Sequence, residues 1–472
     1  MSLAYRILAR RLRAAGARAP TRWPVRRAPS PPGDPILGHL RPILRDRLGF
    51  MTRSFERYGD VVRVHVLGGQ AQLFAHPDHV EEILVRKHRL YTKNTPGYRW
   101  MREFLGEGLL TSEGAVWRRH RRIAQPAFHR RRIEAFAATM TRAGEALLAT
   151  WDEAADTGRP RDIAVDLSAV TLRIAGETLL STDPSAEARE VRRALDVVLH
   201  GFNERSSRPL MLPLAVPTPY NLKLRAAARS LDRVVLGIIE RRRRSGAAPD
   251  DLLQMLLEAR DEDGSGMDDR QLRDEVMTLL LAGHETTANM LAWTLYLLSR
   301  APEHARRVAG EAHDVLGDRP PTVDDLPRLP HGRRVLHEAL RLYPPAWIFG
   351  RSPSADDEVG GYPVPAGSIV FLSPFVTHRH PGFWRDPEGF DPDRWRPERA
   401  AGHHRTQFFP FAAGPRMCIG AGFALMEGQL LLPMLLRRFR FALRPGHPVE
   451  PEPLITLRPK HGIRMTVHRR EL

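Results

Sequence analysis

Apolar positions recur with helical spacing over most of the chain after residue 36, so the pattern predicts a mainly helical protein. The clearest segment spans residues 270–300, beginning after Asp268 and Asp269 and ending before Pro302. At 1.5 Å per residue this helix would be roughly 46 Å long. Residues 276–298 are apolar on nearly every side, which predicts that the helix is buried.

The centre of this segment is interrupted by polar residues, which argues against a membrane span: His284, Glu285, Thr286, Thr287 and Asn289. A second apolar helix is predicted over residues 423–436. Strand-like segments are few, and they lie at residues 61–67, 71–75, 359–371 and 455–467.

The N-terminal segment has a different character from the rest of the chain. Residues 1–33 contain eight arginines and no acidic residue, and residues 3–16 fit a short basic amphipathic helix. Such a helix is typical of a membrane-surface anchor or a presequence, and the alternative is a frayed tail. We therefore expect a basic, Pro-rich segment over residues 1–35 and one domain over residues 36–472, in a cytoplasmic protein without a membrane span. Peripheral membrane contact would fall to residues 1–20.

Composition narrows the classes of protein. A chain of 472 residues that is 42% apolar can bury a large core, which excludes a disordered protein. The net charge of +17 suits nucleic acid, an anionic membrane or an acidic protein partner, and it does not separate them. All but four of the 72 basic residues are arginine. The single cysteine excludes an intramolecular disulfide and a zinc site built on several cysteines, so this thiol is either inert packing or chemistry.

That cysteine, Cys418, lies just before the helix predicted at residues 423–436, where the helix dipole favours a thiolate. Its surroundings resemble FxxGxRxCxG, the haem-thiolate loop of cytochromes P450, at five positions: Phe411, Gly414, Arg416, Cys418 and Gly420. Given the cysteine, the other four would match by chance about 3 times in 100,000. The resemblance extends over residues 36–472.

The resemblance implies a mainly α protein with the cytochrome P450 fold, in which a large helical domain is joined to a smaller β-rich lobe. It also implies haem b between the long central helix and the cysteine helix, with Cys418 as the ligand of the iron. Only 54 residues follow Cys418, so we expect no fused reductase.

Two further motifs occur in the order that the family requires. The stretch from Ala282 to Thr287 resembles the oxygen-activation motif, in which Ala282 leaves room beside the haem and Thr286 and Glu285 act catalytically by delivering protons. Alone, a Glu-Thr-Thr in a helix is weak evidence, because it also fits polar residues around a buried water.

The second motif is the pair Glu338 and Arg341, which resembles the family's ExxR motif. An i,i+3 pair of this kind is usually a solvated pair on a helix surface. In the family the pair is buried and completed by a further arginine, here Arg394, and the triad fixes the segment that presents the cysteine.

By resemblance, further residues are assigned to the haem: Arg416, Trp117, Arg121 and Arg351 to its propionates, and Phe411, Gly420 and Ala282 to its surroundings. The residues expected to line the substrate pocket are Phe104, Leu105, Leu281, Ala346, Trp347, Ile348, Leu454 and Ile455. Each of them singly also fits core packing. Their apolar character predicts a hydrophobic small molecule as substrate.

The leading interpretation is a monooxygenase that inserts one oxygen atom of O2 into a terpenoid or polyketide, with fatty acid as the next substrate class. Electrons would come from an acidic ferredoxin or flavodoxin with its NAD(P)H reductase. Their docking surface would be the basic run at residues 118–132, extended by Arg437, Arg438 and Arg440. A solvated arginine-rich face is the alternative for this run.

Two other functions remain to be weighed. A peroxide-driven or oxygen-independent haem-thiolate enzyme is one, although such enzymes usually lack the acid–alcohol pair found here at Glu285 and Thr286. A haem carrier or a basic binding protein is the other. The chain contains no recognised nucleic-acid module, so we expect no nucleic-acid partner.

Overall fold

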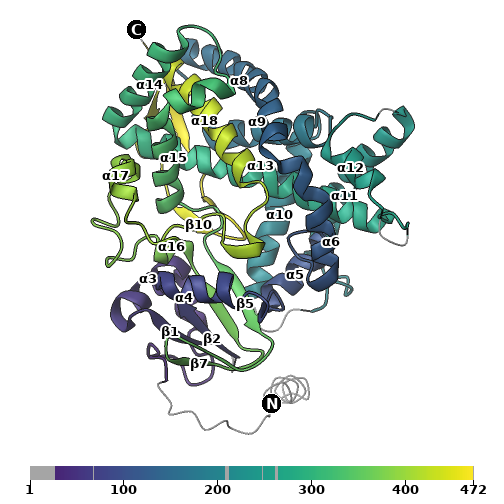
Figure 1. Cartoon of the computed structure of the whole chain (residues 1–472), viewed down its shortest axis with the longest axis vertical. Helices are drawn as coiled ribbons and strands as arrows, with labels where there is room; N and C mark the ends of the chain where they lie inside the picture. The colour runs from purple at the N-terminus through teal and green to yellow at the C-terminus, as the bar shows by residue number, and fades with distance from the viewer. Residues whose placement is uncertain (1–26, 67–68, 208–211, 247, 261–263, 471–472) are drawn as a thin grey trace.

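The computed structural model describes residues 27–66, 69–207, 212–246, 248–260 and 264–470. A large helical body is joined to a smaller lobe that contains β1, β2, β5 and β7 (Figure 1). This architecture is the mainly α fold with a β-rich lobe that the sequence predicts. The amphipathic helix predicted at residues 3–16 and the membrane contact predicted for residues 1–20 lie outside the described residues.

The helical body is built from helices of very different length. The α-helices are α2 (Leu40–Arg45), α3 (Arg47–Tyr58), α4 (Pro77–Glu81), α5 (Pro96–Leu105), α6 (Gly114–Ala124), α7 (Arg130–Ala135), α8 (Ala137–Thr157), α9 (Ile163–Leu179), α10 (Ala188–Ser207), α11 (Pro219–Ser245), α12 (Leu252–Glu258), α13 (Asp269–Arg300), α14 (Pro302–Leu316), α15 (Pro330–Leu342), α16 (Pro374–Thr377), α17 (Pro397–Ala400) and α18 (Ala421–Arg438). Short 3-10 or π turns are η1 (Glu82–Arg86), η2 (Gln125–Phe128), η3 (Val323–Arg328), η4 (Pro392–Trp395) and η5 (Gly414–Arg416).

The strands form small sheets. The largest runs in the order β1 (Val61–Val66), β2 (Gly69–Phe74), β8 (Ile369–Leu372), β5 (Phe349–Pro353) and β3 (Tyr91–Thr92). A three-stranded sheet joins β4 (Arg161–Asp162), β12 (Arg464–Arg469) and β9 (Phe439–Leu443). Two hairpins pair β6 (Asp357–Val359) with β7 (Tyr362–Val364), and β10 (Pro451–Pro453) with β11 (Leu457–Pro459).

The long helix predicted at residues 270–300 is confirmed as α13. Its start is fixed by a capping box, in which the Asp268 carboxylate accepts from the Gln271 N–H at 2.7 Å and the Gln271 side chain accepts from the Asp268 N–H. The helix predicted at residues 423–436 is α18, which begins two residues earlier. In the part of the chain that the structure describes, no helix is long and apolar enough to cross a membrane.

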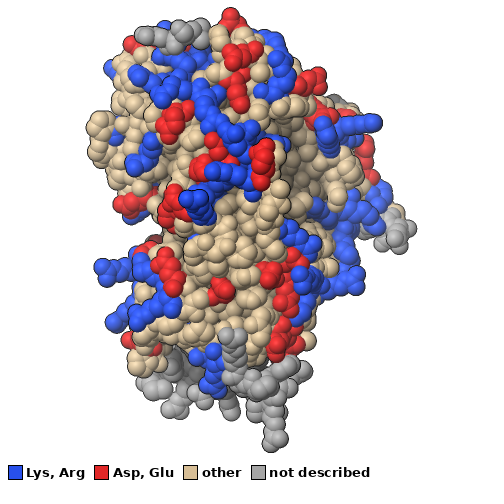
Figure 2. Space-filling view, turned by 60° about the vertical axis from the view of Figure 1, so that its left-hand side comes forward, with Lys and Arg blue, Asp and Glu red and all other residues tan. Residues whose placement is uncertain are grey.

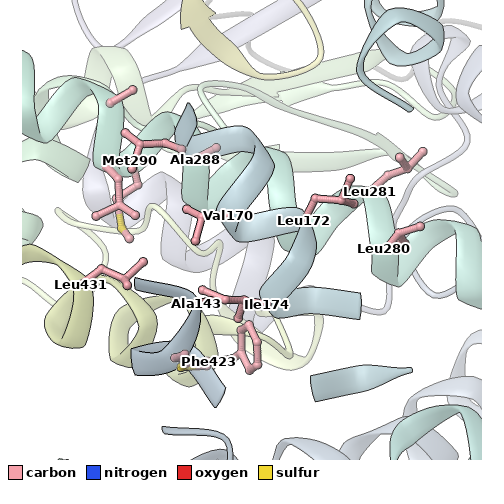
Figure 3. Close-up of a cluster of buried hydrophobic side chains, with 14 of the residues drawn as sticks. Ala143, Val170, Leu172, Ile174, Leu280, Leu281, Ala288, Met290, Phe423 and Leu431 are labelled. Carbon is pink, nitrogen blue, oxygen red and sulfur yellow. The ribbon is translucent and has the colours of Figure 1, made fainter. Parts of the chain in front are cut away.

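The core of the body lies where α8, α9, α13 and α18 meet (Figure 3). Each helix contributes apolar side chains, for example Ala143, Ile174, Met290 and Leu431. Gly144 of α8 allows the closest approach, because a Cβ there would lie 2.7 Å from a methyl carbon of Leu431. The central helix is therefore enclosed by apolar neighbours, as the sequence predicts.

Two features differ from expectation. The folded part begins before residue 36, since Ala28 is buried and the Pro29 carbonyl accepts from the Arg63 N–H at 2.8 Å. Strands β3, β4, β5, β9 and β10 were not predicted, because each has only two to five residues and depends on pairing with another part of the chain.

A buried ion-pair network joins α15 to the segment that follows it. The Glu338 carboxylate accepts from Arg341 Nη2 at 2.8 Å and Nε at 2.9 Å, and from Arg394 Nε at 3.2 Å. The Trp395 indole and the Asp391 N–H donate to the same carboxylate. The structure thus brings the predicted triad together, and both Glu338 and Arg341 are fully buried.

The remaining donors of the two arginines hold backbone. Arg341 Nη1 donates to the His378 carbonyl at 2.9 Å, and its Nη2 donates to the Gly389 carbonyl at 2.7 Å. Arg394 donates to the carbonyls of Arg385 and Asp386. Every nitrogen of Arg341 and Arg394 has an acceptor, so the network pins residues 385–395 to α15.

We expect Glu338→Gln to lower the free energy of unfolding by about 3–5 kcal/mol, because it leaves two buried guanidinium groups without a counter-charge. Urea unfolding followed by circular dichroism measures this change. Arg399→Gln is the matched control, since it breaks an exposed pair with Asp391 in the same segment and should cost about 0–1 kcal/mol. Equal effects of the two substitutions would contradict the assignment.

Candidate functional site

Cys418 is presented by the turn that leads into α18. Its N–H donates to the Phe411 carbonyl at 2.9 Å, which closes the loop between these residues. Gly414, at φ +68°, passes so close to η1 that a Cβ would lie 2.1 Å from the Leu84 carbonyl oxygen, so only glycine fits there. At Gly420 the nearest atoms belong to Phe128 and to the Cys418 sulfur.

The thiol has an unusual setting. Burial raises the pKa of Cys418, while the Gly420 N–H and the Arg121 guanidinium act on the pKa in the opposite direction. Yet part of the side chain is exposed. A thiol surrounded by protein that still keeps open surface at a helix N-terminus is suited to binding an electrophilic centre such as a metal ion.

Aromatic contacts connect the buried triad to this turn. The Trp395 and Phe408 rings are 4.4 Å apart, and the Phe408 ring also lies 5.1 Å from His378. His378 Nε2 accepts from the Phe409 N–H at 2.9 Å. The segment that enters the cysteine loop is therefore anchored to His378, whose carbonyl Arg341 holds, and to Trp395, whose indole donates to Glu338.

A cluster of buried cationic side chains lies beside the loop. Lys93, Arg351 and Arg416 are each buried or nearly so, and Glu113 is the acid that pairs with Arg416, at 2.8 Å. Burial lowers the pKa of Lys93, and the charges of Arg351 and Arg416 lower it further. Among the described residues no partner reaches Arg416 Nη1. The cluster has more positive than negative charge, which suits the binding of carboxylates.

Trp117 and Arg121, on α6, approach the loop from another side. The Arg416 guanidinium lies 3.8 Å from the centre of the Trp117 ring, in a cation–π contact. Arg121 Nη1 donates to the Met417 carbonyl at 2.9 Å. The sequence-predicted residues Trp117, Arg121, Arg351 and Arg416 thus lie around the cysteine loop, although Arg121 is bound to its backbone.

The centre of α13 carries the second part of the site. Thr286 Oγ1 donates to the Ala282 carbonyl at 2.7 Å, and Ala282 is exposed although its helix is buried along most of its length. The Glu285 carboxylate accepts from Thr456 Oγ1 at 2.7 Å. Burial raises the pKa of Glu285, so this carboxyl can hold a proton closer to neutral pH than an exposed one.

The residues predicted to line a substrate pocket fall into two groups. Leu105, Ala346, Ile348 and Ile455 keep partly open surface. Phe104, Leu281, Trp347 and Leu454 are buried, and the Trp347 indole donates to the Leu454 carbonyl at 2.9 Å. Trp347 and Leu454 are core residues and do not line a pocket, because protein covers almost all of their surface.

The loop that contains Phe104 and Leu105 is tied to the start of α13. Arg273 Nη2 donates to the Phe104 carbonyl at 3.0 Å, and the Glu107 N–H donates to the Asp274 carboxylate at 2.8 Å. Gly106 lies against Asp274 so closely that a Cβ would overlap the carboxylate. This loop is therefore fixed against the central helix.

These observations fit a haem. A thiol at a helix N-terminus supplies an iron ligand, and the partly unpaired cationic cluster supplies partners for two propionates. The open surfaces at Ala282 and Cys418 belong to elements that are otherwise packed.

Sequence reasoning missed several of these residues. Lys93 had one signal, because it is one of only four lysines in an arginine-rich chain. Thr456 had none, since its contact with Glu285 joins positions 171 residues apart. Glu113 was missed because a single acid before a basic helix is usually a cap.

Comparison with known proteins agrees with this geometry. The family model described as Cytochrome P450 matches residues 29–466. The chain is 37% identical to cyclooctatin synthase of Streptomyces melanosporofaciens, over 95% of this chain and 96% of the relative. It is 37% identical to pentalenene oxygenase of Streptomyces avermitilis, over 91% and 94%.

Among solved structures, the chain is similar to the crystal structure of the cytochrome P450DA heme domain, with a TM-score of 0.86 and 30% identity. The likeness covers 95% of this chain and 98% of that one. The fold, the cysteine loop and the family match agree, and the chain belongs to the cytochrome P450 family, as a haem-dependent monooxygenase that acts on a hydrophobic substrate with O2 and redox partner proteins.

Proposed function

We propose that this enzyme oxidises a terpenoid, with Cys418 as the haem ligand and Glu285 and Thr286 as the groups that deliver protons. The observation that carries the proposal is the pairing of two sites: an exposed thiol at the start of α18, and an acid–alcohol pair at the centre of α13. A thiolate-bound haem supplies an electron-rich iron that favours O–O cleavage.

The residues that would hold the haem follow from the geometry around the loop. Arg351 and Arg416 would bind the propionates, with Lys93 beside them, since these three basic side chains are gathered around one carboxylate, that of Glu113. Trp117 would fix Arg416 through its ring, and Arg121 would steady the loop at Met417. The walls of the haem site would be formed by Phe411, Gly420 and Ala282.

The terpenoid assignment rests on the relatives and on the lining of the site. One relative is cyclooctat-9-en-7-ol 5-monooxygenase of Streptomyces melanosporofaciens, 38% identical over 91% of this chain. The open apolar positions Leu105, Ala346, Ile348 and Ile455 would contact the hydrocarbon skeleton. The alternative substrates are a polyketide or a fatty acid. Screening compounds of all three classes for binding would distinguish them.

Proton delivery would depend on residues that the chain itself positions. Thr286 is held by its hydrogen bond to the Ala282 carbonyl. Its hydroxyl could instead donate to an oxygen atom of the substrate O2. Glu285 would replace the proton that Thr286 passes on, because burial raises the pKa of its carboxyl.

We also propose that the protein is cytoplasmic. Its electrons would come from an acidic ferredoxin, with a flavodoxin as the alternative donor. Figure 2 shows acidic and basic side chains mixed over one face, so net charge alone does not define a docking surface. Several arginines of the predicted patch have partners: Arg119 with Gln271, Arg130 with Glu134, Arg132 with Asp250, Arg437 with the Arg319 carbonyl and Arg438 with Asp152.

Part of this patch lines a hollow in the surface. A hollow of about 430 Å³ opens beside α6, lined by Trp117, Arg118, Arg121, Arg122, Gln125, Pro126 and His129. Next to it are two exposed apolar side chains, Val116 and Met417, and Met417 precedes the cysteine. Basic side chains beside exposed apolar ones suit the binding of a small acidic protein.

The ligand assignment predicts that Cys418→His abolishes the thiolate-type absorption band of the reduced carbon monoxide complex, together with hydroxylation. Haem content, measured as the pyridine haemochrome, should fall only in part, because the propionate partners remain. Met417→Leu is the control and should retain the band. An unchanged band in Cys418→His would show that another group binds the iron.

Thr286→Ala should lower product formed per NAD(P)H oxidised by roughly tenfold, with the missing electrons recovered as hydrogen peroxide. Substrate affinity, read from the shift of the Soret band, should stay near the parent value. Thr286→Ser should restore coupling, and Thr294→Ala, which removes a similar hydroxyl-to-carbonyl bond on the same helix, should not disturb it. Parental coupling in Thr286→Ala would exclude this hydroxyl as the relay.

Charge reversal of Arg118, Arg122 and Arg131 to Glu should slow reduction by an acidic ferredoxin by about tenfold at low ionic strength. Arg121 is left intact because it holds the cysteine loop. Stopped-flow reduction at rising salt measures the effect, and substrate affinity should not change. Reversal of Arg437, Arg438 and Arg440 is the comparison; a larger loss there would move the docking surface away from α6.

A further inference from the structure

Glu285 is connected to a loop far away in the sequence. Thr456, which precedes β11, donates its hydroxyl to Glu285 Oε1 at 2.7 Å. The next residue, Leu457, is fully buried, its N–H donates to the Pro345 carbonyl, and its carbonyl accepts from the Trp293 indole. Because Leu457 is fixed in this way, Thr456 and Arg458 on either side of it are held at defined positions beside α13.

Arg458 lies among three carboxylates. Its Nη1 donates to Asp196 of α10 at 2.6 Å, and its Nε donates to Glu452 of β10 at 3.2 Å. The third carboxylate is Glu285, whose charge also acts on Arg458. The Arg458 guanidinium therefore binds two carboxylates near the surface, Asp196 and Glu452, and also interacts electrostatically with Glu285 at the centre of α13.

This arrangement runs from solvent to the proton-delivering acid. Asp196 is 43% exposed, Arg458 is 18% exposed, and His200 of α10 lies at the outer end, 3.4 Å from Glu452. Burial has the largest effect and raises the pKa of the Glu285 carboxyl, while the hydrogen bond from Thr456 lowers it. The charged groups that act on this carboxyl come from β11 and α10: Arg458 lowers its pKa, and Asp196 raises it.

We propose that Thr456 and Arg458 are positioning residues that set how readily Glu285 gives up and regains its proton, and that Asp196 of α10 opposes Arg458 in this role. The inference rests on the proposed function, because it concerns the acid of the acid–alcohol pair. Arg458 stays charged at all working pH values, so it acts by its field and not as a proton carrier.

The geometry predicts opposite effects for the two ends of the ion pair. Removing the positive charge at Arg458, or the hydroxyl at Thr456, takes away a group that favours the ionised carboxylate, so Glu285 should hold its proton to higher pH. Removing the negative charge at Asp196 relieves repulsion and leaves Arg458 with fewer competing acids, so Glu285 should ionise at lower pH. A role limited to packing would not produce shifts of opposite sign.

The test is an infrared pH titration of the substrate-free holoenzyme, following the carboxyl C=O absorption that disappears in Glu285→Gln. Arg458→Leu and Thr456→Val should move the midpoint to higher pH by about one unit, and Asp196→Asn should move it to lower pH. Arg458→Lys keeps the charge and should stay near the parent. Lys460→Leu breaks an exposed pair with Glu450 next to the same strand and should leave the midpoint unchanged.

The pH profile of product formed per NAD(P)H should move with the infrared midpoint in each variant. Midpoints that stay at the parent value, or that all move in one direction, would overturn the inference even if Glu285→Gln uncouples the enzyme. Parental coupling in Glu285→Gln would instead refute the proton-delivery role of Glu285, and the infrared shifts would still decide whether Thr456 and Arg458 act on its carboxyl.

Discussion

The buried carboxylate of Glu338 is the constraint on which the cysteine loop and the segment that leads into it depend. An ionised group without water is tolerated only when its hydrogen-bonding capacity is filled, and here two arginines, an indole and a backbone N–H fill it. The arginines in turn use their remaining donors on backbone carbonyls between residues 378 and 389. The arginines that neutralise the Glu338 carboxylate therefore also hold the irregular segment between residues 378 and 389 in one conformation.

That segment matters because the cysteine loop has little regular structure of its own. Its entry, Phe408 and Phe409, packs on Trp395 and His378, and its turn is fixed by Gly414 against the backbone of η1. The loop therefore inherits its position from α15 and the triad. A support of this kind restricts the positions that the thiol can take, which a freely moving loop would not do.

The two faces of the site use charge in opposite ways. Around the cysteine loop, Lys93, Arg351 and Arg416 gather around the single carboxylate of Glu113, and Arg416 Nη1 has no hydrogen-bond acceptor among the described residues, so an anionic ligand would stabilise the folded state there. At the centre of α13, burial raises the pKa of Glu285, while Arg458 and Asp196 act on that pKa in opposite directions. In the proposed function, the first region binds an anionic group and the second exchanges a proton.

The sequence by itself determined the long central helix, the cysteine helix and the residues of the three motifs, because helix period, capping and fixed motif spacing are local properties. Only the tertiary structure decided which partners these residues meet. The contacts of Glu285 with Thr456, of Arg416 with Glu113, and of Arg341 with the His378 carbonyl join positions 171, 303 and 37 residues apart. Strands β5 and β9 and the packed start at Ala28 were missed for the same reason: they are stabilised by distant neighbours, and a local pattern carries no record of those.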